Sequence, residues 1–368
     1  MLQRIGPEDR AHFDYLIGTS PEPDFAQTAA WAKLKSLTWR PVHYLYQVTE
    51  GEPLIAVTAW LRRPPLFPYS LAYAPRGPIL LQAAAEQHLP RFWEELRREL
   101  RRLGAFGLKI DPAWSSPTRA EQMVSLGFRP VESDSPFGGT QPRKMIRQDI
   151  SADPEELLAS IPKKIRYNIR YPEKNGVTYR LGDVTDIPGL MSVLRDTSRR
   201  KQFLERGPEY YERLLTAMGD QASLILGYFE GQVIAAGVTV VCGKIAWAVY
   251  GGMLRSHNHL RPYYGLNWQR MLWAKSRGAE VFDFSGVPVD LSESSPLYGL
   301  YTFKKSFGGE LVEFIGEYEW PILALPYWFW NHFSPLAMRL FKALARRLRG
   351  AARSESGEDE PDDSVSGG

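Results

Sequence analysis

Apolar and polar residues follow the same order in two long stretches of the chain. The first stretch predicts two buried strands, an amphipathic helix and a third strand, at Gly51–Trp60, Leu71–Ile79, Glu86–Leu103 and a segment that ends at Asp111. The second predicts the same series, at Gly231–Val241, Ile245–Met253, Tyr264–Arg277 and a segment that ends at Asp283. The two aspartates are 283 − 111 = 172 residues apart. A whole series repeated in order indicates an internal duplication, because chance produces at most one similar element.

The duplication predicts an α/β protein with two similar domains, at 1–150 and 151–320. A length of 368 residues suits two cores of ordinary size. Mixed strands with amphipathic helices between them fit two tandem GNAT-like domains, the fold of many N-acyltransferases, with mixed sheets flanked by helices. At the start of the second domain, Pro154–Arg170 repeats apolar residues along one helical face, and Pro162 is expected to divide it into two helices.

The C-terminal part of the chain differs from both repeats. Residues 323–350 mix aromatic and aliphatic side chains with five basic ones, so this helix either packs on the first domain or lies flat on a membrane surface. The longest apolar run, Trp320–Trp330, is too short to span a bilayer. Residues 351–368 hold six acidic side chains and one arginine, which predicts a disordered tail. Without that tail's charge of −5 the net charge of +3 becomes +8, and a basic body favours anionic partners.

Several common catalytic motifs are absent from the sequence. It has no Walker-type GxxxxGK[ST], no GxGxxG after a strand, no CxxC and no HExxH, which removes the usual sites for nucleotide hydrolysis, dinucleotide redox chemistry and zinc peptidase chemistry. His257 and His259 have no cysteine or carboxylate close by in sequence, so we expect no metal site and no bound cofactor. The loop [RQ]xxGx[GA], which binds coenzyme A in GNAT enzymes, is matched only after a helix, at Arg347–Ala352, and this disfavours a coenzyme A donor.

The cysteine content and the N-terminus bear on where the protein works. The single cysteine, Cys242, lies in an apolar strand, where we expect it to be an inert core residue. One cysteine cannot form an intrachain disulfide, and the charged N-terminal segment does not have the pattern of a signal peptide. Both features predict a cytoplasmic location.

Four segments together resemble a known family. The most specific is FDFSGVPVDLSESSPLYGLYTFKKSFGGE, which begins at Phe282; the others are FAQTAAWAKLKSLTWRP, IPKKIRYNIRYPEKNGV and RGPEYYERL. With them, residues 20–320 resemble the FemX/FemA/FemB peptidoglycan-bridge aminoacyltransferases. That family transfers an amino acid from aminoacyl-tRNA to a side-chain amine in the stem peptide of a cell-wall precursor. The chain has no long heptad-bearing insertion, so it resembles the compact FemX type.

The resemblance implies a set of residues that bind the precursor. Carried onto this sequence, they are Lys35, Trp39, Arg206, Tyr210 and Tyr250. Lysine and arginine can donate to a diphosphate, and tyrosine can orient it through its hydroxyl and ring. Simpler alternatives remain open: Lys35 as a surface charge, Arg206 in an ion pair with its neighbour Glu205, and the three aromatic residues as core.

The resemblance also places Phe303 and Lys304 at the reaction centre. Attack of an amine on the tRNA ester builds negative charge on the ester oxygen, and a fixed ammonium stabilises that charge where water is excluded. Lys305 is the rival to Lys304, because alternation along a strand would point the two lysines to opposite faces. A basic edge strand without a catalytic role is the alternative for the whole segment. Asp111 is either the base that accepts the amine's proton or the cap of a turn.

A basic helix face offers a place for tRNA. Its cations are Lys163, Lys164, Arg166 and Arg170. The tyrosines between them could stack on unpaired bases, although such a charge run is equally typical of a solvated face.

We therefore expect an aminoacyltransferase with aminoacyl-tRNA as co-substrate and a muropeptide precursor, UDP-linked or lipid-linked, as acceptor, working in the cytoplasm or at the inner membrane face. The alternatives are an N-acyltransferase that uses acyl-CoA or another carrier, and a non-catalytic module that binds precursor or RNA.

Overall fold

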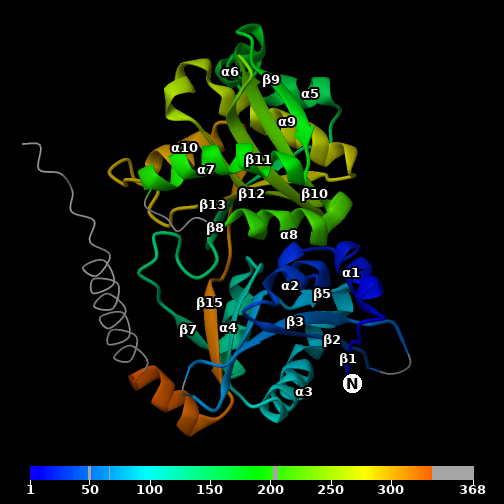
Figure 1. Cartoon of the computed structure of the whole chain (residues 1–368). Coiled ribbons are helices and arrows are strands. Elements are labelled where there is room, and N and C mark those ends of the chain that lie inside the picture. The colour runs from blue at the N-terminus through cyan, green and yellow to red at the C-terminus, as the bar shows by residue number, and fades with distance from the viewer. Residues whose placement is uncertain (49–50, 66, 202–205, 334–368) are drawn as a thin grey trace, which may run out of the picture.

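The computed structural model describes residues 1–48, 51–65, 67–201 and 206–333, and it has two sheets, one in each half of the molecule (Figure 1). The first sheet has the strand order β1 (Leu2–Arg4), β2 (Arg40–Tyr46), β3 (Ile55–Arg62), β4 (Ser70–Arg76), β6 (Ala105–Pro112), β15 (Glu317–Pro321) and β7 (Arg129–Val131), with β5 (Ile79–Leu80) paired to β3. The second has the order β14 (Glu310–Glu313), β8 (Lys144–Asp149), β13 (Val281–Val287), β12 (Ile245–Met253), β11 (Gln232–Cys242), β10 (Ala222–Phe229) and β9 (Thr178–Gly182).

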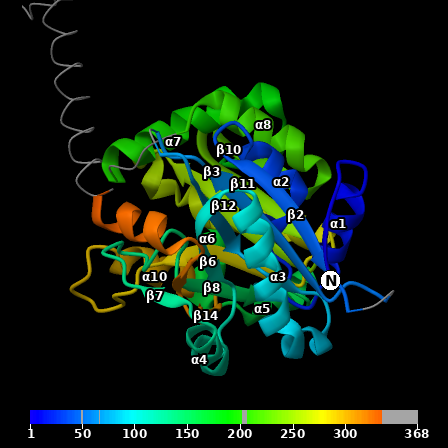
Figure 2. The same ribbon diagram turned by 90° about the horizontal axis from the view of Figure 1, so that it is seen from below.

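Helices cover both sheets. They are α1 (Arg10–Gly18), α2 (Ala29–Lys35), α3 (Leu89–Arg102), α4 (Pro117–Ser125), α5 (Pro154–Ser160), α6 (Lys163–Lys174), α7 (Ile187–Lys201), α8 (Pro208–Met218), α9 (Pro262–Ser276) and α10 (Tyr298–Lys305). Seen from below, α3 crosses the first sheet (Figure 2). It buries Phe92, Trp93, Leu96 and Leu100 against that sheet, each contributing about 2 kcal/mol by apolar burial.

The predicted duplication is confirmed by the strand order. In each of the series β2-β3-β4-β6 and β10-β11-β12-β13, the first three strands are antiparallel and the last two are parallel. Helix α3 connects the parallel pair β4–β6, and α9 connects the parallel pair β12–β13. The halves differ in that parallel pair. Strands β4 and β6 pair from Ser70 to Arg76, whereas β12 and β13 pair only from Ile245 to Trp247 and then separate. The second sheet is therefore splayed where β12 and β13 part.

Two strands pair in the sheet of the opposite half. Strand β8 lies within the predicted range 1–150 but pairs with β13, and β15 begins within 151–320 but pairs with β6 (Figure 1). The chain crosses between the halves at each of these strands. A third connection is apolar, since Trp31 and Leu34 of α2 belong to one buried cluster with Leu214 of α8. These crossings and this cluster join the two halves closely.

The finer predictions had mixed outcomes. Helices α5 and α6 are separate, as predicted, because Ile161 leaves the helical conformation and Pro162 directly precedes the first residue of α6. The prediction of a strand around Lys304 is wrong, since Tyr298–Lys305 is helical. Phe303 in α10 and Phe307 just after it both pack on Tyr264. An extended strand would hold two residues four positions apart about 13 Å from each other, too far for both rings to contact one tyrosine.

Candidate active site

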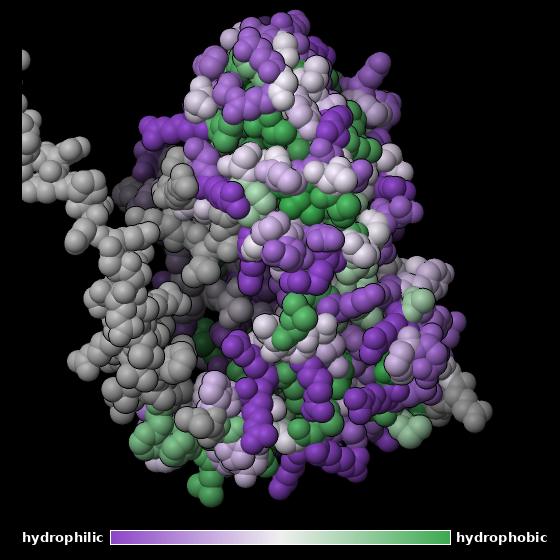
Figure 3. Space-filling view, viewed as in Figure 1, coloured by the Kyte–Doolittle hydropathy of each residue, from purple (hydrophilic) through white to green (hydrophobic). Residues whose placement is uncertain are grey.

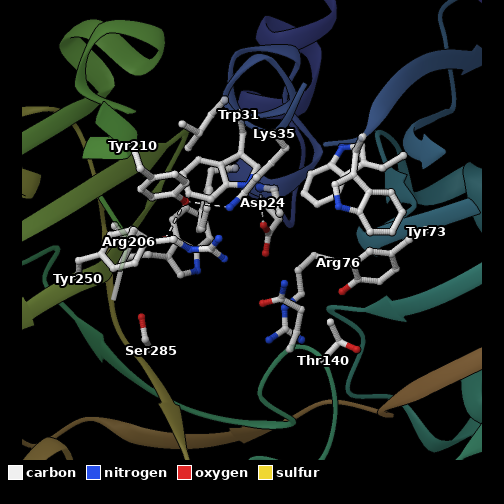
Figure 4. A pocket seen from close by; sticks show the side chains of 18 of the residues that line it. Asp24, Trp31, Lys35, Tyr73, Arg76, Thr140, Arg206, Tyr210, Tyr250 and Ser285 are labelled. Atoms are coloured by element: carbon white, nitrogen blue, oxygen red, sulfur yellow. Dashed lines mark hydrogen bonds between the residues drawn. The ribbon is translucent and has the colours of Figure 1, made fainter. Parts of the chain in front are cut away.

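A cavity of about 690 Å³ lies where the two halves face each other, within the size range of ligand-binding clefts (Figure 4). From the first half it is lined by the end of α2 and the edges of β3 and β4. From the second half it is lined by α8, β12 and the splayed part of β13. All five predicted precursor-binding residues line it: Lys35, Trp39, Arg206, Tyr210 and Tyr250.

Three of these residues form a hydrogen-bonded row. Lys35 Nζ donates to the hydroxyl of Tyr210 at 2.8 Å, and that hydroxyl is 2.8 Å from the hydroxyl of Tyr250. Lys35 is the last residue of α2, Tyr210 lies in the first turn of α8, and Tyr250 is on β12. The ammonium also lies 5.1 Å from the ring centre of Trp31. Tertiary packing therefore assembles one polar row from segments that are far apart in sequence.

Arg206 lies beside this row, and Trp39 lies elsewhere on the cavity wall. The guanidinium of Arg206 lies 5.3 Å from the ring centre of Tyr210, on an exposed segment before α8. Glu205, its predicted alternative partner, lies outside the described residues. Trp39 packs at an angle against Trp60 and Tyr73, with its indole half-buried.

The electrostatics of the cavity favour an anion. Burial, followed by repulsion from Arg206, lowers the pKa of Lys35 from 10.5 to about 8. Arg62 and Arg213, which sequence reasoning did not identify, also line the cavity. Because burial and the nearby Arg206 both disfavour the charged form of Lys35, a bound diphosphate would stabilise that form and raise its pKa again.

Lys304 lies behind the wall on the other side of the cavity. Its Nζ donates to the carbonyl oxygen of Gly286 at 2.7 Å, and Gly286 lines the cavity where β13 has separated from β12. Only glycine fits there, because a Cβ at this position would lie 2.3 Å from Cγ of Pro142. Lys305 is exposed and donates to the carbonyl of Gly309 instead.

Phe303 has a packing role in the structure. Its ring centre lies 5.6 Å from that of Tyr263 and 5.0 Å from that of Tyr264, both on α9. It is not among the described residues that line the cavity. These contacts fix α10, and therefore Lys304, against the second half.

Asp111 lies close to the cavity without lining it. Its Oδ2 accepts a hydrogen bond from the hydroxyl of Tyr73 at 2.6 Å, and its Oδ1 accepts one from the backbone N–H of Arg76 at 2.8 Å. Burial raises its pKa to about 6. Both oxygens are thus engaged in holding the end of β4, which matches the structural alternative for this residue better than the role of base.

The structure does not bring the predicted tRNA-binding residues near this cavity. Lys163, Lys164 and Arg170 are exposed on α6, at the far end of the second half, and Arg166 donates to the carbonyl of Ala159 (Figure 1). The helix presents an open basic face, which suits either a solvated surface or a polyanion.

Sequence reasoning missed Asp24, Tyr73, Arg76 and Arg270. The first three line the cavity. Arg270 is fully buried and holds β11 and β12 together, donating to the carbonyl of Val238 at 2.6 Å and to that of Tyr250 at 3.3 Å. Arg270 could have been noticed in the sequence, because an arginine in the middle of an apolar helical pattern is unusual. Asp24, Tyr73 and Arg76 could not, because single polar residues in or beside strands are common.

Cys242 is buried, which confirms its core role, and no cluster of three or more metal-binding side chains occurs in the described part of the chain. None of the helices described is both long and apolar enough to cross a bilayer. The helix at 324–333 packs Trp330 on Phe106 and leaves Leu325 and Trp328 80% and 53% exposed; the rest of the predicted 323–350 helix, and the tail, lie outside the described residues.

Two tandem GNAT-like domains that share a cationic cavity define the class of this protein: it has an N-acyltransferase-type fold. The match to the FemAB family model is extensive, over residues 9–232 and 228–334, and the chain belongs to that family.

Three similar proteins illustrate the family. The UDP-N-acetylmuramoylpentapeptide-lysine N(6)-alanyltransferase of Weissella viridescens is 24% identical over 86% of this chain and 95% of its own length. A lipid II:glycine glycyltransferase of Staphylococcus saprophyticus is 22% identical over 95% of this chain and all of its own. The crystal structure of FemX superposes with a TM-score of 0.80 at 20% identity, covering 89% of this chain and 99% of that one. The two named enzymes add amino acids to peptidoglycan precursors.

Proposed function

We propose that the protein transfers an amino acid from aminoacyl-tRNA to a side-chain amine in the stem peptide of a peptidoglycan precursor. The observation that carries the proposal is the shared cavity, with the Lys35–Tyr210–Tyr250 row and Arg206 in one part and the Gly286 carbonyl that holds Lys304 in another. The functions of the named relatives support it.

The chemistry follows from this arrangement. The diphosphate of the precursor binds at Lys35 and Arg206, where burial makes each charge-assisted hydrogen bond stronger than in water. The stem peptide then extends along the cavity towards β13. As the amine attacks the ester carbon, the Lys304 ammonium stabilises the negative charge on the ester oxygen. Neither a metal ion nor a cofactor is needed for this acyl transfer.

Aminoacyl-tRNA is the proposed donor, and the basic face of α6 is its proposed docking surface. Lys163, Lys164 and Arg170 provide exposed cations, and Tyr167 is 56% exposed beside them. The guanidinium of Arg261 lies 4.9 Å from the ring centre of Tyr171, which keeps that ring next to the cationic face. Cations bind phosphates, and aromatic faces stack on unpaired bases, so the helix combines both requirements.

Contact with the inner face of the cytoplasmic membrane is part of the proposal. The helix at 324–333 exposes Leu325, Trp328 and Phe329, and the space-filling view shows apolar side chains gathered over this corner (Figure 3). The guanidinium of Arg129, on β7, lies 5.9 Å from the ring centre of Tyr327, which belongs to this helix. Aromatic side chains beside a cation are typical of a helix that lies in the surface of an anionic membrane, where a lipid-linked acceptor would be found.

A transfer assay tests the proposed function. The protein is incubated with charged tRNAs and a UDP-linked muropentapeptide, and the mass of the precursor is then measured by mass spectrometry. We expect the mass of one added amino acid residue with the wild-type protein, its loss with Lys304→Met, and its retention with Lys305→Met. Transfer from an acyl-CoA without tRNA would instead support the other N-acyltransferase function.

A further inference from the structure

Asp24 is the one carboxylate among the described residues that line the cavity. Asp24 is only 3% exposed. Its Oδ1 accepts a hydrogen bond from the backbone N–H of Ala26 at 2.8 Å and so caps the short helical turn Phe25–Gln27. The described hydrogen bonds leave Oδ2 without a donor. Figure 4 shows the carboxylate directed into the cavity, between the row at Lys35 and the side chain of Arg76.

The charged groups around Asp24 come from three strands, and none of them forms an ion pair with it. The guanidinium of Arg76, at the end of β4, donates to the carbonyl of Pro142 at 2.7 Å. Arg147 on β8 pairs with Asp283 on β13 at 2.9 Å. Burial raises the pKa of Asp24 to about 6, and Arg76 and Arg147 oppose that rise. A carboxylate in this setting is ionised at neutral pH and can accept a proton near that pH.

Asp24 and Asp111 therefore differ in the role that their surroundings allow. Asp111 uses both oxygens within the first half and does not line the cavity. Asp24 lines the cavity and has one oxygen without a donor among the described hydrogen bonds, and the same cavity is lined by Gly286, whose carbonyl accepts from the Lys304 ammonium. A carboxylate from the first half thus shares the cavity with the Gly286 carbonyl, behind which the Lys304 ammonium lies.

We propose that Asp24 binds the acceptor's ammonium group and takes the proton that this group loses before it attacks. The proposal rests on the proposed function and names the base for that reaction. The ammonium passes one proton to Oδ2 of Asp24, its nitrogen bonds to the ester carbon, and the carbon–oxygen bond to the ribose breaks. The second proton of the nitrogen goes to the ribose oxygen, and Asp24 releases its own proton to solvent.

A binding experiment tests the recognition of the amine. Calorimetric titration compares UDP-linked muropentapeptide with its side-chain amine free or acetylated, against the wild-type protein, Asp24→Asn and Asp14→Asn. The Asp24→Asn variant keeps the oxygen that caps the turn, so we expect it to fold. Asp14 is the matched control, since its carboxylate binds the backbone of α2 outside the cavity.

We expect the wild-type protein and Asp14→Asn to prefer the free amine, and Asp24→Asn to lose about tenfold of that preference while binding the acetylated form like the wild type. Wild-type preference that persists unchanged in Asp24→Asn overturns the proposal. A wild-type protein that binds both forms equally also overturns it, but leaves the proposed function standing. Absence of any precursor binding by the wild type removes the proposed function itself.

Kinetics provide a readout that a purely structural role would not move. In single-turnover transfer, Asp24→Asn should be at least about a hundredfold slower. The wild-type and Asp14→Asn rates should rise with pH through a midpoint near 6, and Asp24→Asn should lack that step. An unchanged step in Asp24→Asn contradicts the assignment of Asp24 as the base.

Discussion

Replacing Lys35 with methionine should make the protein more stable and less able to bind its precursor. The lowering of the Lys35 pKa from 10.5 to about 8 corresponds to about 3 kcal/mol of destabilisation of the charged form. Partial exposure of the side chain reduces this to about 2 kcal/mol. The hydrogen bond to Tyr210 returns about 1 kcal/mol of stability to the wild type. We therefore expect Lys35→Met to raise the free energy of unfolding at pH 7 by about 1 kcal/mol.

The stability difference between Lys35→Met and the wild type should depend on pH, and the lowered pKa of Lys35 sets the direction of that dependence. Below pH 8 the lysine is protonated in both the folded and the unfolded state, so the wild type bears the full cost. Between pH 8 and 10.5 only the unfolded state still binds the proton, and wild-type stability rises with pH relative to the variant. The advantage of Lys35→Met should shrink or reverse across this interval.

Urea unfolding of the two proteins at several pH values between 7 and 10.5 measures this difference. Lys33→Met, an exposed position on the same helix, is the control and should show no such pH dependence. Precursor affinity, measured by calorimetry, should fall at least about tenfold in Lys35→Met only. A stability difference between wild type and Lys35→Met that stays constant with pH would refute the reasoning about burial.

Three further predictions concern the other proposed surfaces. Lys304→Met should slow transfer about a hundredfold and leave precursor affinity unchanged, whereas Lys305→Met should change neither the rate nor the affinity. Equal losses of transfer rate in the two variants would argue against a role for the Lys304 ammonium that is bound to Gly286. Lys163→Ala should lower the slope of log affinity for tRNA against log salt by about one in filter binding, and an unchanged slope removes α6 from the interface. Trp328→Ser should reduce sedimentation with anionic liposomes severalfold compared with Leu181→Ser, an exposed position in the second half, and equal sedimentation of the two would exclude the helix at 324–333.

Much of the fold was predictable because each half repeats strong local patterns. The strand at Ile245–Met253 has the predicted bounds, and α9 and α3 lie within a few residues of theirs. Buried strands and amphipathic helices are encoded by which residues must leave water, and that information is local. The segment around Lys304 was predicted wrongly because two lysines beside a phenylalanine fit a strand or a helix equally well. Packing of Phe303 and Phe307 on α9 decided between them.

The candidate site was predictable only in part. The segments that resemble the FemX type pointed to Lys35, Arg206, Tyr210 and Tyr250, and all four line one cavity. Asp24 could not be found this way, because its significance lies in the direction of its carboxylate and in the lack of an ion-pair partner among the residues that the structure describes. Neither property is visible in a sequence.

The sequence by itself determined that the chain has two similar α/β halves, where their strands and helices lie, and which cations and tyrosines are available. The tertiary structure alone decided that β8 and β15 pair in opposite sheets, that β12 and β13 separate beside Gly286, and that the Asp24 carboxylate faces the cavity. The physical reason is that hydrophobic periodicity acts over a few neighbouring residues, whereas strand exchange, burial of charge and the shape of a cavity depend on segments more than a hundred residues apart.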